Sequence, residues 1–308
     1  MKNVKVILWG LGAMGGGIGK MLTKKKGVDI VGAIDIGDKI GKSLYDVVPG
    51  IVKGDREDVI VGTPEEVIKP GAADIVVVCT NSFTKDVFDK LVFVMERGMN
   101  VITSAEEMAY PQAQEPELAK KLDEIAKKNG VSVMGTGINP GLIMDLLVVL
   151  WTAACEEVNH VTSRRVNSLS PFGPAVMEEQ GIGISVEEFN ERKANGTMAG
   201  HVGFAESTMM ICDALGWKWD DFGQDMEPIV TDVDRKSPYG FAAAGQVAGV
   251  AMKGWVNIDG ERKIDMDHPQ QIEPEQVGVH TGDYVILDAV PPVNMVNTPE
   301  IEGGIGTI

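Results

Sequence analysis

The sequence is poor in cysteine and histidine, and neither residue type is arranged as a metal site. Its three cysteines lie far apart, and none forms a Cys-x-x-Cys pair: Cys79, Cys155 and Cys212. An odd number of separated cysteines argues against a disulfide framework and against a zinc site. The four histidines include no adjacent pair and no His-x-x-x-His spacing. We therefore expect no metal, and a reducing, cytoplasmic location.

Basic residues and long apolar runs are also scarce. Lys and Arg number 28 against 45 Asp and Glu, which gives a net charge of −17. Such a field repels phosphate backbones and argues against nucleic acid as a partner. The longest apolar stretches, at 75–79 and 142–154, are too short to span a bilayer. No charged segment followed by an apolar one opens the chain, so we expect no signal peptide and no membrane partner.

Glycine, in contrast, is abundant. It makes up 37 of 308 residues, which is about 12%, against an average near 7% in globular proteins. The length suits two domains of about 150 residues each. In the first half, short apolar runs alternate with amphipathic stretches, which is typical of a doubly wound parallel sheet. We expect strands at 4–9, 29–34, 75–79, 100–103 and 131–134, and a helix at 116–128.

The pattern changes after about Gly141. Asp259-Gly260 is a strong signal for a two-residue hairpin turn. The expected elements are helices at 142–154, after Ser185 and at 201–215, and strands at 247–258, 262–266, 284–290 and 293–296. The predicted fold class is α/β. Residues 1–141 form a doubly wound parallel domain, and residues 142–308 form an α+β domain for substrate binding and dimerisation on a mixed or antiparallel sheet.

A Gly-x-Gly-x-x-Gly pattern follows the first strand and opens a helix, which is the context of a Rossmann dinucleotide-binding site. The first glycine permits a tight turn, the second lets the backbone approach a pyrophosphate, and the third lets the helix pack on the sheet. The helix N-terminus offers free N–H groups to the anion. An aspartate about 20 residues later suits the ribose. The expected contacts are Gly10, Gly12, Ala13, Met14, Gly15 and Asp35.

Asp35 also bears on the choice of cofactor. Its carboxylate suits both hydroxyls of an adenosine ribose and repels a 2′-phosphate. Lys39 and Lys42 follow closely and are able to reach such a phosphate. We expect NAD as the cofactor, with NADP tolerated.

Small polar residues follow three further strands of the first domain. Ligands bind at the carboxyl ends of parallel strands, and three such loops in succession favour contacts with the cofactor over ordinary loop composition. The expected contacts are Thr80, Asn81, Ser82, Thr103, Ser104, Asn139 and Pro140.

The loop after the strand at 100–103 carries two carboxylates, Glu106 and Glu107. A carboxylate in an apolar pocket exchanges protons near neutral pH. Ser104 and Glu107 fit a capping box, which gives Glu107 a structural role and leaves Glu106 to face the ligand. The same box can be drawn from Thr103 to Glu106, so Glu107 stays the alternative. Two solvated acids at a helix start are the non-functional interpretation.

Candidate substrate contacts lie in the second half. Arg164 and Arg165 fall on an expected strand. Either guanidinium suits a substrate carboxylate, and a surface pair on alternating faces is the alternative. His201 opens an expected helix, as either a capping residue or a substrate contact.

Taken together, these motifs resemble the 2,4-diaminopentanoate dehydrogenase family over nearly the whole chain. The glycine motif is shared by many dehydrogenases, whereas the segments of the second half are more specific. The segments that carry the resemblance are 7–15, 104–111, 135–141, 166–174, 200–204 and 268–271. The wider group is similar to dihydrodipicolinate-reductase-type dehydrogenases and includes native amine dehydrogenases.

The resemblance implies an NAD(P)-dependent amine dehydrogenase of anaerobic ornithine degradation. Its reaction is the oxidative deamination of 2,4-diaminopentanoate at C4 to 2-amino-4-oxopentanoate and ammonia. It implies a homodimer, and a catalytic glutamate for which Glu106 is the best match. Family members continue beyond residues 303–308, so a shortened chain is expected to leave Ile305 and Ile308 on an exposed apolar edge.

The chain departs from true dihydrodipicolinate reductases, because it lacks their His-His pair and downstream Lys motif. This disfavours a cyclic-imine reductase. Two alternatives stay open: an amine dehydrogenase or reductive aminase for simple amines and ketones, and a non-catalytic NAD-binding sensor.

Overall fold

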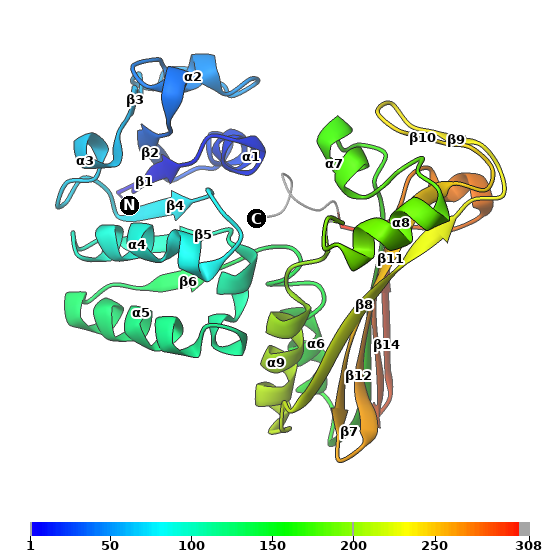
Figure 1. Ribbon diagram of the computed structural model, residues 1–308. Helices are drawn as coiled ribbons and strands as arrows, with labels where there is room; N and C mark the ends of the chain where they lie inside the picture. The colour runs from blue at the N-terminus through cyan, green and yellow to red at the C-terminus, as the bar shows by residue number, and fades with distance from the viewer. Residues whose placement is uncertain (1, 199, 302–308) are drawn as a thin grey trace. The chain divides into compact units, whose positions relative to one another are not determined.

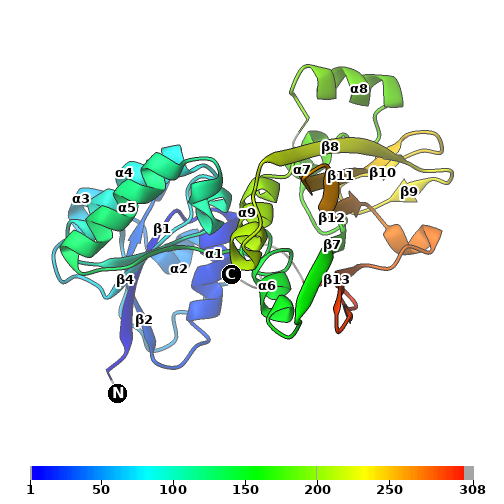
Figure 2. The same ribbon diagram turned by 90° about the horizontal axis from the view of Figure 1, so that it is seen from below.

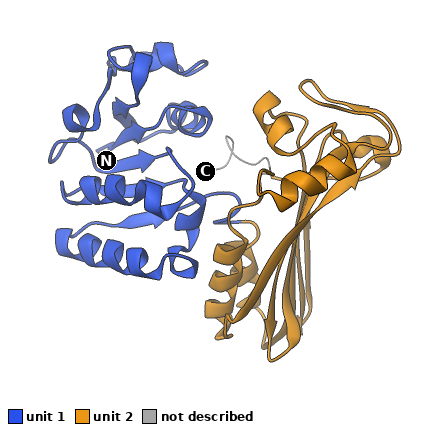
Figure 3. Ribbon diagram, in the orientation of Figure 1, with its two compact units in different colours: residues 1–142, 302–308 blue, residues 143–301 orange. Residues whose placement is uncertain are grey.

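The structure, a computed structural model, describes residues 2–198 and 200–301. The chain divides into two compact units, the first ending at Leu142 and the second running from Ile143 to Ile301 (Figure 3). Ile305 and Ile308, which were expected at an exposed edge, lie outside the described residues.

The first unit is built on a six-stranded sheet in which every neighbouring pair is parallel. In spatial order the strands are β3 (Val61–Gly62), β2 (Val28–Ile34), β1 (Val4–Trp9), β4 (Ile75–Val78), β5 (Asn100–Thr103) and β6 (Val133–Gly135). Chain order reverses at β1, where β2 lies on one side and β4 on the other. This is the doubly wound Rossmann arrangement, and the prediction for this half is confirmed.

Helices cover both faces of this sheet, and the alternation along β1 shows why. Ile7 and Trp9 pack in a core with α4 and α5, whereas Val6 and Leu8 pack in a second core with α1 and α2. A strand covered on both faces reads as a continuous apolar run. The helices are α1 (Ala13–Leu22), α2 (Leu44–Val47), α3 (Pro64–Val67), α4 (Thr84–Met95) and α5 (Pro116–Asn129), and α4 and α5 lie side by side (Figure 1).

The second unit is built on a mixed six-stranded sheet. In spatial order the strands are β14 (Val293–Asn297), β13 (Gly282–Val290), β7 (Glu157–Ser168), β12 (Glu261–Gln271), β11 (Val247–Ile258) and β8 (Asp221–Val230). Only the β7–β12 pair of this sheet is parallel. The β11–β12 hairpin turns through Asp259 and Gly260, both at positive φ, as a type I′ turn requires. A two-stranded ribbon pairs β9 (Arg235–Lys236) with β10 (Phe241–Ala242).

Two helices of the second unit, α6 (Leu146–Thr152) and α9 (Phe204–Leu215), lie side by side against the sheet (Figure 2). Both are shorter than predicted. The helix expected at 142–154 begins only at Leu146, because the buried Asp145 accepts the Leu146 N–H at 2.7 Å as its N-cap. The remaining helices are α7 (Pro174–Glu179) and α8 (Val186–Ala194). Within the described ranges, no helix has the length and apolar character needed to cross a membrane.

Candidate functional site

A cavity of about 320 Å³ lies in the first unit, where β4, β5 and β6 end. All three predicted loops line it, together with Met14 from α1. Its lining consists of Met14, Cys79, Thr80, Asn81, Ser82, Ser104, Glu106, Thr136, Gly137, Ile138, Asn139 and Pro140. Thr103, by contrast, is fully buried and binds the Ala105 N–H through Oγ1 at 3.1 Å. The folded chain therefore brings most of the loop residues together and turns Thr103 inward.

The three motif glycines differ in what surrounds them. Gly10 has φ +96°, and a Cβ there would lie 2.5 Å from the Cys79 carbonyl oxygen. A Cβ on Gly15 would lie 1.8 Å from the Gly10 oxygen. Only at Gly12 would a Cβ meet no described atom within 4 Å. Close packing thus requires the outer two glycines, and the middle one leaves open backbone at the α1 N-terminus, which fits a pyrophosphate.

Asp35 lies beside this turn and is already partnered. Its carboxylate accepts the Leu11 N–H at 2.8 Å and the Lys39 ammonium at 2.7 Å. Burial raises the pKa of Asp35, but hydrogen bonds from Lys39 and from the backbone outweigh it and hold the pKa below its usual value. Asp35 is therefore an anion neutralised by a lysine. Lys42 pairs instead with Asp38 on the surface, at 3.3 Å.

The two neighbouring glutamates have different surroundings. Glu107 is buried, and its carboxylate accepts the Thr84 N–H at the start of α4 at 2.7 Å. Glu106 is half-buried and lines the cavity. The predicted capping box is wrong, because the short 3₁₀ helix Glu106–Ala109 has Ala105 as its N-cap residue. The structural role of Glu107 is instead to cap α4, and Glu106 is the carboxylate that faces the site.

Asn139 supplies a polar group to the same cavity. Both atoms of its carboxamide are buried, and neither has a hydrogen-bond partner among the described residues. Buried polar groups are normally paired, so this side chain fits a bound ligand that carries both a donor and an acceptor.

Lys90 is a site residue that the sequence prediction missed. It projects from α4 and donates to Thr80 Oγ1 at 2.9 Å and to Asn81 Oδ1 at 2.5 Å, both of which line the cavity. Burial lowers its pKa. Helical side chains lean toward the N-terminus of their helix. A lysine in the second turn of a helix that follows a ligand loop is the signal that would have found it.

The predicted substrate contacts lie in the second unit. On β7, Arg164 is half-exposed and its Nε lies 3.0 Å from Asp267. Arg165 points inward, pairs with the fully buried Asp283, and donates to the Ile301 carbonyl at 2.6 Å. Both guanidinium groups are therefore engaged by aspartates, and a role for either in substrate binding stays a prediction.

His201 lies just before α9 and lines a small cavity of about 160 Å³ in the second unit. Its Nε2 is enclosed, with no hydrogen-bond partner among the residues described. Burial, followed by the nearby His268 and Arg165, holds the pKa of His201 well below its usual value. Its ring is neutral at pH 7, so it suits a neutral hydrogen bond better than an ion pair. Its role in substrate binding stays a prediction.

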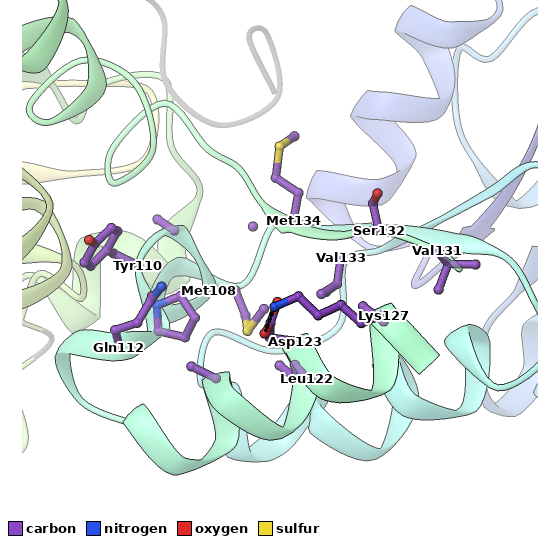
Figure 4. Close-up of a pocket in the computed structure, with 15 residues that line it drawn as sticks. Met108, Tyr110, Gln112, Leu122, Asp123, Lys127, Val131, Ser132, Val133 and Met134 are labelled. Atoms are coloured by element: carbon purple, nitrogen blue, oxygen red, sulfur yellow. Dashed lines mark hydrogen bonds and ion pairs between the residues drawn. The ribbon is translucent and has the colours of Figure 1, made fainter. Parts of the chain in front are cut away.

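A second, larger cavity of the first unit, about 430 Å³, lies along α5 and the edge strand β6. Met134 of this strand and Ser132 just before it extend to one side, and Val133 extends to the other (Figure 4). Its charged side chains, Asp123 and Lys127, form an ion pair with each other, with Lys127 Nζ 2.6 Å from Asp123 Oδ2. Because it offers neither an unpaired acid nor the glycine turn, we assign the chemistry to the cavity that contains Glu106.

Comparisons with known proteins place the chain among dehydrogenases. Residues 142–308 match the family described as 2,4-diaminopentanoate dehydrogenase C-terminal domain. Over its full length the chain is 68% identical to a 2,4-diaminopentanoate dehydrogenase from Acetoanaerobium sticklandii, of which it covers 87%.

Solved structures show the fold. An amine dehydrogenase from Mycobacterium smegmatis has a TM-score of 0.78 at 24% identity, over 99% of this chain and 89% of that one. A scyllo-inositol dehydrogenase from Lactobacillus casei, solved with NAD(H) and scyllo-inositol, has a TM-score of 0.53 at 10% identity, over 96% and 76% of the two chains. At these identities the likeness establishes the α/β fold and nothing finer.

Proposed function

The chain belongs to the 2,4-diaminopentanoate dehydrogenase family, and we propose that it is an NAD(P)-dependent amine dehydrogenase. Its proposed reaction is the oxidative deamination of 2,4-diaminopentanoate at C4 to 2-amino-4-oxopentanoate and ammonia. One observation carries this assignment: at the carboxyl ends of a dinucleotide-binding sheet, Glu106 faces the cavity while Glu107 is bound to the Thr84 N–H.

The first unit has the features that a nicotinamide dinucleotide requires. The open backbone at Gly12 would hold the pyrophosphate, and Asp35 would bind the adenosine ribose. The buried carboxamide of Asn139 has the donor and acceptor that a nicotinamide amide matches. When bound, the nicotinamide ring supplies a hydride acceptor for the C4 hydrogen of the substrate.

Glu106 manages the protons of the reaction. Its carboxylate takes a proton from the substrate ammonium and passes it to solvent, since only the free amine has the lone pair that stabilises the carbon as hydride departs. Loss of hydride leaves an iminium on the substrate, and the regenerated carboxylate of Glu106 then removes a proton from the water that attacks the iminium carbon. The protonated carboxyl gives that proton to the amine nitrogen of the carbinolamine. As the C–N bond breaks and ammonia leaves, the carboxylate takes the hydroxyl proton and the ketone forms. In the reverse direction Glu106 protonates the departing hydroxyl.

A panel of amines tests the substrate assignment. We expect reduced nicotinamide to form with 2,4-diaminopentanoate, and much more slowly with ornithine and with 2-aminobutane. Turnover of the plain amine alone would favour the alternative enzyme, which acts on simple amines. That alternative needs no carboxylate anchor, and it would be favoured if both Arg164 and Arg165 pointed to solvent. Arg165 is instead buried against Asp283. Cofactor binding without turnover of any amine would favour the non-catalytic sensor.

For the cofactor we propose NAD, with NADP tolerated. The Lys39 ammonium lies 2.7 Å from the Asp35 carboxylate and neutralises its charge. The ribose site therefore repels a 2′-phosphate less than it would if Asp35 had no cationic partner. In the wild-type enzyme, kcat/KM is expected to be higher with NAD than with NADP. Replacing Lys39 with Met should lower kcat/KM for NADP by about tenfold and change that for NAD much less, because Asp35 would then stand uncompensated.

Lys42→Met is the matched control for this prediction, since Lys42 pairs with Asp38 and not with Asp35. It is expected to change both values by less than about twofold. A strong preference of the wild-type enzyme for NADP, or an equal loss with both cofactors in Lys39→Met, would contradict the assignment.

The assembly and location of the enzyme are also proposals. We propose a cytoplasmic homodimer that takes a small diamino acid as substrate. The three free cysteines Cys79, Cys155 and Cys212 support a reducing compartment. Sedimentation equilibrium of the purified enzyme tests the dimer, and cell fractionation tests the location.

A further inference from the structure

The side chain of Lys90 hydrogen-bonds to two residues that line the cofactor cavity. Its ammonium donates to Thr80 Oγ1 at 2.9 Å, to Asn81 Oδ1 at 2.5 Å and to the Asp86 carbonyl at 3.2 Å. A lysine has three donors and no acceptor, so its hydrogen-bonding capacity is fully used. Two of the three bonds go to side chains that line the cavity.

The same loop is fixed at its other end. Glu107 accepts the Thr84 N–H at 2.7 Å, and its own N–H donates to the Ser82 carbonyl at 3.1 Å. The segment between β4 and α4 is therefore held by Lys90 near its start and by Glu107 near its end. Glu107 adjoins Glu106, so these bonds also join the cofactor loop to the loop that carries the acid.

Fixing the side chains of a binding site before the ligand arrives strengthens binding. Asn81 is exposed, and a freely rotating side chain loses rotamer entropy when a ligand fixes it. A charged hydrogen bond that fixes the side chain beforehand removes that cost from binding. The Lys90 ammonium serves two such side chains at once.

We propose that Lys90 is a positioning residue for the nicotinamide cofactor, orienting Thr80 and Asn81 before the cofactor binds. It acts through these two side chains and does not take part in proton transfer. The inference rests on the proposed function only in requiring that the cavity takes a nicotinamide dinucleotide.

The test is the Kd for NADH, measured by fluorescence titration of the full chain without amine. Lys90→Met is expected to raise Kd by about tenfold. Lys90→Arg, which keeps the charge and several donors, should recover at least half of the loss on a logarithmic scale. Lys85→Met is the matched control on the same helix, because Lys85 is 71% exposed and pairs with Glu115. It should leave Kd unchanged.

A second measurement keeps the inference testable if Lys90→Met folds poorly. In a protein that already carries Thr80→Val and Asn81→Ala, Lys90→Gln should raise Kd by less than about twofold, whereas in wild type it should raise Kd severalfold. An unchanged Kd in Lys90→Met, or an equal effect of Lys90→Gln in both backgrounds, would overturn the proposal. Because no amine is present, failure to oxidise 2,4-diaminopentanoate would count against the proposed function and leave this result standing.

Discussion

Replacing Glu106 with glutamine is expected to lower kcat for amine oxidation by about 10²- to 10⁴-fold, the range typical of a lost general acid–base. The amide keeps the shape of the side chain but cannot accept the amine proton or activate water. NADH should still bind with a Kd within about twofold of the wild-type value, because the glycine turn and Asp35 are untouched. Steady-state kinetics and a parallel fluorescence titration measure the two quantities separately.

Glu107 gives the matched control, since it is the neighbouring acid on the same loop. In Glu107→Gln the amide oxygen can still accept the Thr84 N–H, so kcat should fall by less than about tenfold. In Glu107→Ala the N-terminus of α4 loses its acceptor, and the free energy of unfolding should fall by about 1–2 kcal/mol. If Glu106→Gln kept its activity while Glu107→Gln lost it, the roles of the two acids would be reversed.

The second large effect concerns stability. Arg165→Met is expected to lower the free energy of unfolding by about 3–5 kcal/mol, because it leaves the Asp283 charge buried without its partner. The Asp283 side chain is 0% exposed and Arg165 only 3%. Arg165 also donates to the Ile301 carbonyl, while Asp283 accepts the Ile301 N–H at 2.8 Å. Loss of the pair therefore also releases the end of the second unit. Urea unfolding followed by circular dichroism measures the change.

Arg164 is the control residue for this effect. It stands beside Arg165 on the same strand, but its ion pair with Asp267 is half-exposed, and such pairs contribute about 0–1 kcal/mol. Arg164→Met should therefore be nearly neutral for stability. Arg165→Met combined with Asp283→Leu should recover much of the loss, since no buried charge is then unpaired. Equal effects of the two single arginine variants would contradict the role given to this buried pair.

Local patterns predicted the first unit well. The apolar run of β1, the glycine turn and the helix that ends at Gly130 depend on residues close in sequence. Gly130 adopts the left-handed C-cap conformation that its position indicates. The hairpin at Asp259 and Gly260 is likewise a local signal. The start of α6 was predicted too early, because the apolar run begins before Asp145. The helix begins only after Asp145, whose carboxylate accepts the Leu146 N–H as the N-cap.

Long-range partners were the part that the sequence could not supply. Glu107 caps a helix that begins 23 residues earlier, and Arg165 pairs with a carboxylate 118 residues later. Alternation along a strand indicates that Arg164 and Arg165 face opposite sides of the sheet, but it does not tell which side is buried. For Asp35 and Lys39, the four-residue spacing suggests that the two side chains lie near each other, but only the folded chain shows that they form an ion pair.

The ratio of ammonia released to NADH formed from 2,4-diaminopentanoate tests the central claim most directly. Oxidative deamination at C4 by the wild-type enzyme predicts one ammonia for each NADH, with 2-amino-4-oxopentanoate as the organic product. The same measurement with Glu106→Gln should give neither product at a comparable rate. NADH without ammonia, a product oxidised at C2, or undiminished turnover by Glu106→Gln would contradict the account.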